Sequence, residues 1–114
     1  MAKTAEKYLP LTESAYLILT SLTEPCHGYG IMQETASATA SGIKLGPGTL
    51  YTALGKLMKY GLIRLSGESG TGGERRKLYC LTPLGLEVVV LECRRLAALA
   101  EWGRTKLAKT GVSL

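Results

Sequence analysis

Residues 47–59 read PGTLYTALGKLMK, and this stretch decides the fold that the rest of the chain must fit. Its apolar residues recur at the i, i+3, i+4 and i+7 spacing of one buried stripe on an α-helix. The stripe consists of Leu50, Ala53, Leu54 and Leu57. At about 100° per residue, the opposite face is small, polar and basic. It consists of Gly48, Thr52, Gly55, Lys56 and Lys59, flanked by Thr49 and Tyr51. Pro47 is a favoured first helical residue, so we expect a helix that starts there and closes at Gly61.

Two further helices are expected before this one. Thr12 can cap a nearly continuous apolar helix over residues 14–23, which Glu24-Pro25 ends. A short turn, Cys26-His27-Gly28, leads into a second helix of about a dozen residues that Ser41-Gly42 stops. The three helices together predict a small helical core.

The segment after Gly61 predicts a β-hairpin. A first strand begins at Leu62, and a second strand is expected over residues 75–81. Between them, residues 66–73 contain four glycines, which favours a flexible loop flanked by basic residues. A phosphate-binding P-loop is excluded because no Lys-Ser/Thr pair and no helix follow the glycines.

A long helix is predicted to begin at the cap Thr82-Pro83 and to run to about Lys109, roughly 40 Å at 1.5 Å per residue. One apolar seam alternates steps of three and four residues along it. The seam consists of Leu86, Val89, Cys93, Leu96, Ala100, Gly103 and Leu107. Further apolar residues widen this surface beyond what a small core can cover, so we expect a second chain to cover it.

These elements predict one mainly α domain with a small β-hairpin (α+β), that is, a winged helix-turn-helix followed by a long C-terminal dimerisation helix. The expected organisation is a flexible N-terminus over 1–10, a winged helix-turn-helix over 11–82, the dimerisation helix over 83–109 and a flexible tail over 110–114.

Basic residues concentrate in the middle of the chain. The net charge is +5, and residues 44–77 hold seven Lys or Arg against two Glu, which is already 7 − 2 = +5. Residues 1–43 sum to −2 and residues 78–114 to +2. A concentrated basic surface on a folded domain is the electrostatic feature expected for a polyanion partner, although an ordinary solvated face can look the same.

Residue types that catalytic and metal sites commonly use are missing or rare in this chain. The chain has no Asp, no Asn and one His, so catalytic dyads and metal clusters are hard to assemble. We therefore expect no enzyme activity, no metal site and no cofactor. The three cysteines, Cys26, Cys80 and Cys93, are far apart and are expected to be buried reduced thiols. No segment is apolar enough for a membrane span or a signal peptide, which predicts a cytoplasmic protein.

Five blocks of sequence, in order, resemble the PadR family of transcriptional regulators. They are Leu11-Thr12, His27-Gly28-Tyr29-Gly30-Ile31, residues 48–54, Gly61-Leu62-Ile63 and residues 75–85. The similarity spans about residues 11–107, and the single C-terminal helix resembles the compact members of that family. The resemblance implies a homodimeric DNA-binding regulator, in particular a repressor that reads an inverted-repeat operator in duplex DNA.

The resemblance also implies roles for matching residues. The third helix would enter the major groove, so that Thr49, Tyr51, Thr52 and Lys56 face bases and phosphates. Gly28 and Tyr29 would lie near the DNA backbone, and Arg75, Arg76 and Lys77 would anchor the wing. Lys44 and Lys59 complete the expected DNA-binding set from the basic middle segment. Tyr51 has an alternative role as a core or interface residue.

Some compact relatives respond to flat aromatic compounds, which implies a small aromatic effector for this chain. Leu96 stands where drug-responsive relatives carry a tryptophan, and Trp102 lies about two turns further on. Both are therefore candidate effector-binding residues.

Two other functions stay open. One is a helical dimerisation or adaptor protein that keeps the winged fold without DNA binding. The other is a redox sensor at Cys26, because a neighbouring imidazolium such as that of His27 can lower a thiol pKa.

Overall fold

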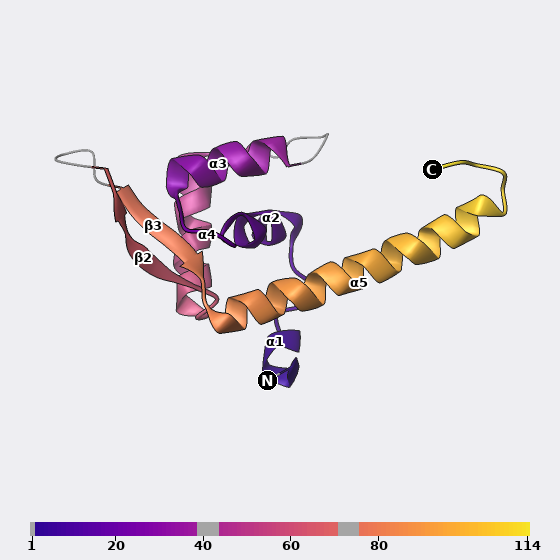
Figure 1. The fold of residues 1–114 in the computed structure, drawn as a ribbon, viewed down its shortest axis with the longest axis horizontal. Coiled ribbons are helices and arrows are strands. Elements are labelled where there is room, and N and C mark those ends of the chain that lie inside the picture. The colour runs from indigo at the N-terminus through magenta and orange to yellow at the C-terminus, as the bar shows by residue number, and fades with distance from the viewer. Residues whose placement is uncertain (1, 39–43, 71–75) are drawn as a thin grey trace.

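The computed structural model describes residues 2–38, 44–70 and 76–114. In chain order the elements are α1 (Ala2–Glu6), α2 (Glu13–Ser21), β1 (Cys26–His27), α3 (Gly28–Ser37), α4 (Pro47–Lys59), β2 (Ile63–Ser69), β3 (Arg76–Leu81) and α5 (Pro83–Ala108). Figure 1 shows α2, α3 and α4 gathered beside the hairpin, with α5 running away from them. The winged helix and the long C-terminal helix that the sequence predicts are thus confirmed. The expected helix stop at Ser41-Gly42 lies outside the described residues.

Local signals at the helix starts explain where the helices begin. The Thr12 hydroxyl accepts the Ala15 N–H at the start of α2, and Pro47 occupies the first position of α4. His27 caps α3, since its Nδ1 accepts the Gly30 N–H at 3.0 Å. The sequence did not indicate this histidine cap, because histidine is an uncommon N-cap residue.

The small sheet has one strand more than expected. Its order is β1-β3-β2, with both pairs antiparallel. β1 pairs Cys26 with Tyr79 and His27 with Leu78, in a segment that the sequence predicted as a turn. A two-residue strand carries no period-2 pattern, so only its pairing with β3 reveals it. In β2 the register shifts between Leu65 and Gly67, where Gly67 has a positive φ of 140°.

The core lies between the three helices, the base of the hairpin and the first half of α5. Fully buried side chains from every layer meet there, among them Ile18, Leu19, Leu22, Ile31, Leu50, Leu54, Leu62 and Val88. The predicted stripe of α4 therefore faces inward, which leaves its polar face for solvent.

α5 is anchored along its first half, where Val88 and Val89 are buried in the core and the first turn is fixed by hydrogen bonds. The Thr82 hydroxyl accepts the Gly85 N–H, and the Thr82 N–H donates to the Leu62 carbonyl. Gly85 is buried against the Leu62 backbone. The rest of the helix extends beyond the domain body, so the longest dimension of the chain is 60 Å (Figure 1).

The N-terminal segment differs from the flexible tail predicted over residues 1–10. Residues 2–6 form α1, which packs against α5 on the side away from α3 and α4 (Figure 1). Ala5 is fully buried, and Tyr8 and Leu9 pack against the core. A five-residue helix is too short to display an apolar period, so the sequence carried no signal for it. Among the described helices, none is long and apolar enough to cross a membrane.

Candidate nucleic-acid interface

The outer face of α4 is polar and open to solvent. Thr49, Thr52, Lys56 and Lys59 are all exposed, whereas Leu50, Leu54 and Leu57 on the inner face are buried. Gly55 also lies on the outer face, and no atom approaches the space that its side chain would occupy. This face can therefore meet a flat or grooved partner without steric hindrance.

Tyr51 links α4 to the start of α3. Its side chain is 50% exposed, and a Cβ built on Gly28 would lie 2.4 Å from the Tyr51 hydroxyl oxygen. Gly28 itself is buried, and its place near the DNA backbone stays a prediction. The absence of a side chain at Gly28 makes room for the ring of Tyr51.

A basic hollow of about 370 Å³ opens between the start of α3 and β3. Its lining includes His27, Tyr29, Tyr51, Arg76 and Lys77. The Arg76 guanidinium lies 5.7 Å from the centroid of the Tyr29 ring. Because His27 Nδ1 accepts the Gly30 N–H, a neutral ring carries its proton on Nε2. Cations, N–H groups and phenols around one hollow suit an oxyanion such as a phosphate.

The wing strand β3 begins with two exposed cations. Arg76 and Lys77 lie at the start of β3, where Lys77 pairs in register with Glu68 of β2. Lys44 is exposed just before α4. Arg75, the third predicted wing residue, lies outside the described residues.

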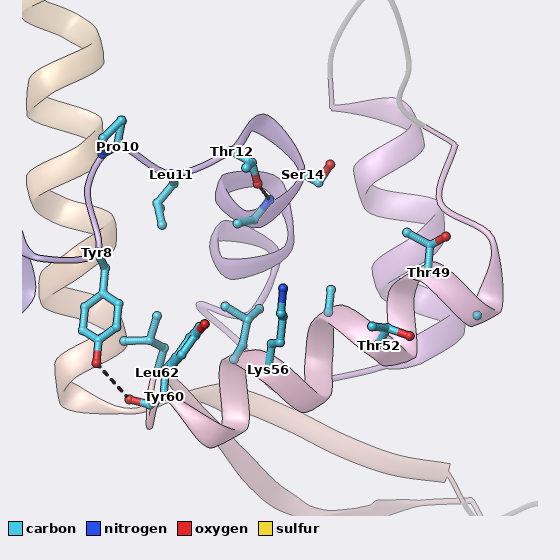
Figure 2. Close-up of a pocket in the computed structure, with 14 residues that line it drawn as sticks. Tyr8, Pro10, Leu11, Thr12, Ser14, Thr49, Thr52, Lys56, Tyr60 and Leu62 are labelled. Carbon is cyan, nitrogen blue, oxygen red and sulfur yellow. Dashed lines mark hydrogen bonds between the residues drawn. The ribbon is translucent and has the colours of Figure 1, made fainter.

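A larger groove of about 840 Å³ follows one side of α4. Its other wall consists of the start of α2 and the segment 7–12, which we call the N-terminal strap. Figure 2 shows Thr49, Thr52 and Lys56 along the α4 wall, with Tyr8 and Tyr60 at one end. Sequence patterns cannot reveal this groove, because its two walls lie far apart along the chain.

The strap is held to α5 by a buried carboxylate. Glu92 is 1% exposed, and its Oε2 accepts the Leu11 N–H at 2.7 Å. Arg95 pairs with the same carboxylate, with its Nη2 at 3.0 Å from Oε2. The Arg95 guanidinium lowers the pKa of Glu92, and the Leu11 N–H acts in the same direction. The i, i+3 spacing of Glu92 and Arg95 is readable in the sequence, but the contact with Leu11 is not.

The predicted seam of α5 divides into two parts. Val89 is 7% exposed and belongs to the chain's own core, so its assignment to a dimer interface is wrong. An apolar seam has the same spacing whether the helix packs on the core of its own chain or on a partner chain. The sequence pattern therefore could not distinguish core residues from interface residues. The other predicted interface residues are exposed on the single chain, namely Leu86, Cys93, Leu96, Ala100 and Leu107.

Trp102 lies on the half of α5 that extends away from the domain. Its side chain is 65% exposed, and the Lys106 ammonium lies 4.5 Å from the ring centroid. Leu99 beside it is also exposed. This end of the helix therefore carries several large apolar side chains that are exposed on the single chain.

The cysteines differ in their surroundings. Cys80 is buried and Cys26 is half-buried, whereas Cys93 is exposed, so the expectation of three buried thiols fails at Cys93. Burial raises the pKa of the Cys26 thiol, with the Glu34 carboxylate acting in the same direction. A raised pKa disfavours the reactive thiolate and argues against redox sensing at this position.

Comparison with known proteins gives the family. The profile of the "Transcriptional regulator PadR-like family" matches residues 17–89. An uncharacterized 37.1 kDa protein in transposon TN4556 of Streptomyces fradiae is 38% identical over 89 residues, which are 77% of this chain and 24% of that protein. The chain thus spans about a quarter of the length of this curated relative.

Solved structures of the family are similar to this chain. A PadR family transcriptional regulator from Eggerthella lenta is 28% identical with a TM-score of 0.66, over 95% of this chain and 88% of that one. A PadR family regulator from Clostridium difficile is 25% identical with a TM-score of 0.66, over 82% and 97%. Bacillus subtilis PadR in complex with operator DNA shares the fold, at 24% identity and a TM-score of 0.59, over 70% and 45%. Since the profile match covers more than half of the chain, the chain belongs to the PadR-like family of transcriptional regulators, as its sequence motifs indicate.

Proposed function

We propose that this chain is a sequence-specific DNA-binding regulator, and in particular a repressor that acts as a homodimer on an inverted-repeat operator. The observation that carries the proposal is the exposed polar face of α4 beside the basic hollow at β3. A helix with such a face is the element that winged helix-turn-helix proteins place in the major groove. This role implies a cytoplasmic location.

The proposal divides the interface into two kinds of contact. Thr49, Thr52 and Lys56 read base edges, whereas Arg76 and Lys77 hold phosphates. Tyr29 and Tyr51 line the same hollow as the wing cations, and their hydroxyls are suited to phosphate oxygens. Lys44, Lys59 and Arg75 add to the positive potential around the duplex. Bacillus subtilis PadR, which has the same fold, was solved in complex with operator DNA, and this supports DNA as the partner.

Dimerisation through α5 is the second part of the proposal. The exposed apolar residues of its outer half leave a surface that a monomer in water rarely presents. A second copy of the helix covers that surface and sets two α4 helices at the spacing of two half-sites.

The third part is an effector. Trp102 and Leu96 lie on the exposed half of α5, and a flat aromatic compound can stack on the Trp102 ring between two such helices. Binding that favours a different separation of the two α4 helices then weakens operator binding by linkage.

A salt titration tests the DNA-binding proposal. Duplexes are first selected from a random pool by binding to the protein, and their affinity is then measured between 50 and 300 mM salt. Replacing Arg76 and Lys77 with alanine is expected to lower the slope of log K against log[salt] by about two units. In contrast, Thr52→Ala relaxes base preference without a change in slope.

The matched control replaces Arg104 and Lys109 with alanine, which removes the same charge from the far end of α5. Its slope should equal that of the wild type. The proposal is contradicted if the salt slope of the control falls as much as that of the wing variant. It is also contradicted if no duplex is enriched from the pool. The second result favours the adaptor function that has no DNA partner.

A further inference from the structure

The groove between α4 and the N-terminal strap has the walls of a ligand site. Apolar side chains come from both sides, with Leu11 and Ala15 facing Ala53, Leu57 and Leu62. The α4 wall runs from Gly48 to Tyr60, which is about 18 Å at 1.5 Å per residue. The groove therefore runs along most of α4 and can accept an extended apolar molecule.

One end of the groove is closed by two aromatic rings. The centroids of Tyr8 and Tyr60 lie 5.7 Å apart, and the Tyr8 hydroxyl donates to the Tyr60 carbonyl at 3.4 Å. These contacts fix the strap to the end of α4. At the other side of the strap, Glu92 holds the Leu11 N–H. Because both ends of the strap are bound, the apolar wall exists before any ligand arrives.

The charge on the groove lining is positive. Among the described residues that line it, Lys56 is charged and no carboxylate is present. Its side chain rises from α4 toward the start of α2 (Figure 2). The N-terminus of α2 adds the positive end of a helix dipole there, while Glu13 in the same turn lies outside the groove lining. A ligand with one negative charge and an apolar body complements these walls.

We propose that this groove binds an extended apolar monocarboxylate, with its carboxylate at Lys56 and its hydrocarbon chain along Leu57 and Leu62. A medium-chain alkanoate has this chemistry. The site is separate from Trp102, which is not among the residues that line the groove and belongs to the last turns of α5.

Because of where the groove lies, a bound ligand also affects DNA binding. Thr49, Thr52 and Lys56 line the groove and also belong to the proposed base-reading face. A bound alkanoate covers part of that face and neutralises one of its cations. The ligand and the duplex therefore exclude each other directly; this step rests on the proposed function, whereas ligand binding itself does not.

Calorimetric titration of the full chain with sodium decanoate, without DNA, tests the site. We expect saturable binding of one molecule per chain that weakens about fourfold for each methylene removed, because each buried methylene contributes a constant transfer free energy. Decyltrimethylammonium, with a similar chain and the opposite charge, should show no saturable binding.

Two lysine variants on the same helix form a matched pair. Lys56→Met is expected to weaken decanoate binding at least tenfold. Lys59→Met removes the same charge one turn away, outside the groove lining, and should change decanoate binding less than twofold. The absence of saturable binding, equal losses in both variants, or equal binding of the cation overturns the proposal.

A second measurement tests the exclusion of DNA. Decanoate should lower the affinity of a duplex selected from a random pool, whereas Trp102 fluorescence stays constant. If decanoate binds as expected and the chain selects no duplex, the site stands and the proposed function fails. If decanoate binds and a selected duplex keeps its affinity, the exclusion is wrong.

Discussion

Replacing Gly85 with alanine is expected to destabilise the chain strongly, because α5 begins in contact with another backbone segment. An ideal Cβ at this position would lie 1.9 Å from the Leu62 carbonyl oxygen and 2.9 Å from its carbonyl carbon. A carbon and an oxygen that are not bonded normally stay about 3.3 Å or more apart. The two segments must therefore separate by more than about 1 Å.

The loss of folding free energy can be estimated from the contacts that this separation disturbs. The Leu62 carbonyl accepts the Thr82 N–H at 3.0 Å, and loss of such a bond costs about 1 kcal/mol. Overpacking of a well-packed contact costs about 1–3 kcal/mol more. The better helix propensity of alanine returns about 1 kcal/mol, which leaves a net loss of about 1–3 kcal/mol.

Gly55→Ala is the matched control. Gly55 lies in the interior of α4, is exposed, and has no atom within 4 Å of the added Cβ. The same substitution should therefore stabilise the chain by up to about 1 kcal/mol. The assay is urea denaturation followed by circular dichroism at one fixed protein concentration, since dimerisation makes apparent stability depend on concentration. A Gly85→Ala variant within about 0.5 kcal/mol of the wild type would refute the reasoning.

Three other predictions concern α5. Because Arg95 lowers the pKa of Glu92, the pair stabilises the fold above the ordinary carboxyl pKa of about 4.3, and this contribution is lost as pH falls through the lower folded value. Glu92→Gln should therefore be less stable than the wild type at pH 7, and the difference should shrink toward pH 3; an unchanged difference contradicts the assignment. Leu96→Glu should sediment as a monomer, since it places a charge in the proposed interface at a cost of several kcal/mol; a dimer would show that the interface lies elsewhere. A flat aromatic effector should quench Trp102 fluorescence saturably and weaken duplex binding by the same coupling free energy. Quenching that leaves duplex affinity unchanged would separate Trp102 from regulation.

Periodicity predicted the elements whose patterns are long enough to show a period. The four-residue stripe and Pro47 located α4 to within a residue or two, and the Thr82-Pro83 cap located the start of α5. β1 and α1 were missed because two and five residues are too few for a pattern. What makes these short elements stable is their packing on distant parts of the chain.

Among the site residues, too, helical periodicity predicted exposure, whereas contacts between distant segments could not be predicted. The exposure of Thr52, Lys56 and Lys59 follows from the helical period, and the structure agrees. The burial of Gly28 under Tyr51 could not be predicted, because that contact joins α3 to α4. Neither could the burial of Val89, since an apolar seam does not reveal which surface it meets.

The anchoring of α5 at one end makes it a lever. Its first half is fixed to the domain body from Thr82 to the Glu92 carboxylate, and the turns after Arg95 extend about 20 Å beyond it. A rotation of about 10° at the end of the supported half displaces the far end by about 3 Å, which is comparable to one base-pair step of DNA. In reverse, a change of a few ångströms in how two such far ends meet is converted into a small rigid rotation of the whole domain. A displacement at the far end of α5 thus becomes a rotation of the DNA-binding domain, and no helix or strand has to unfold.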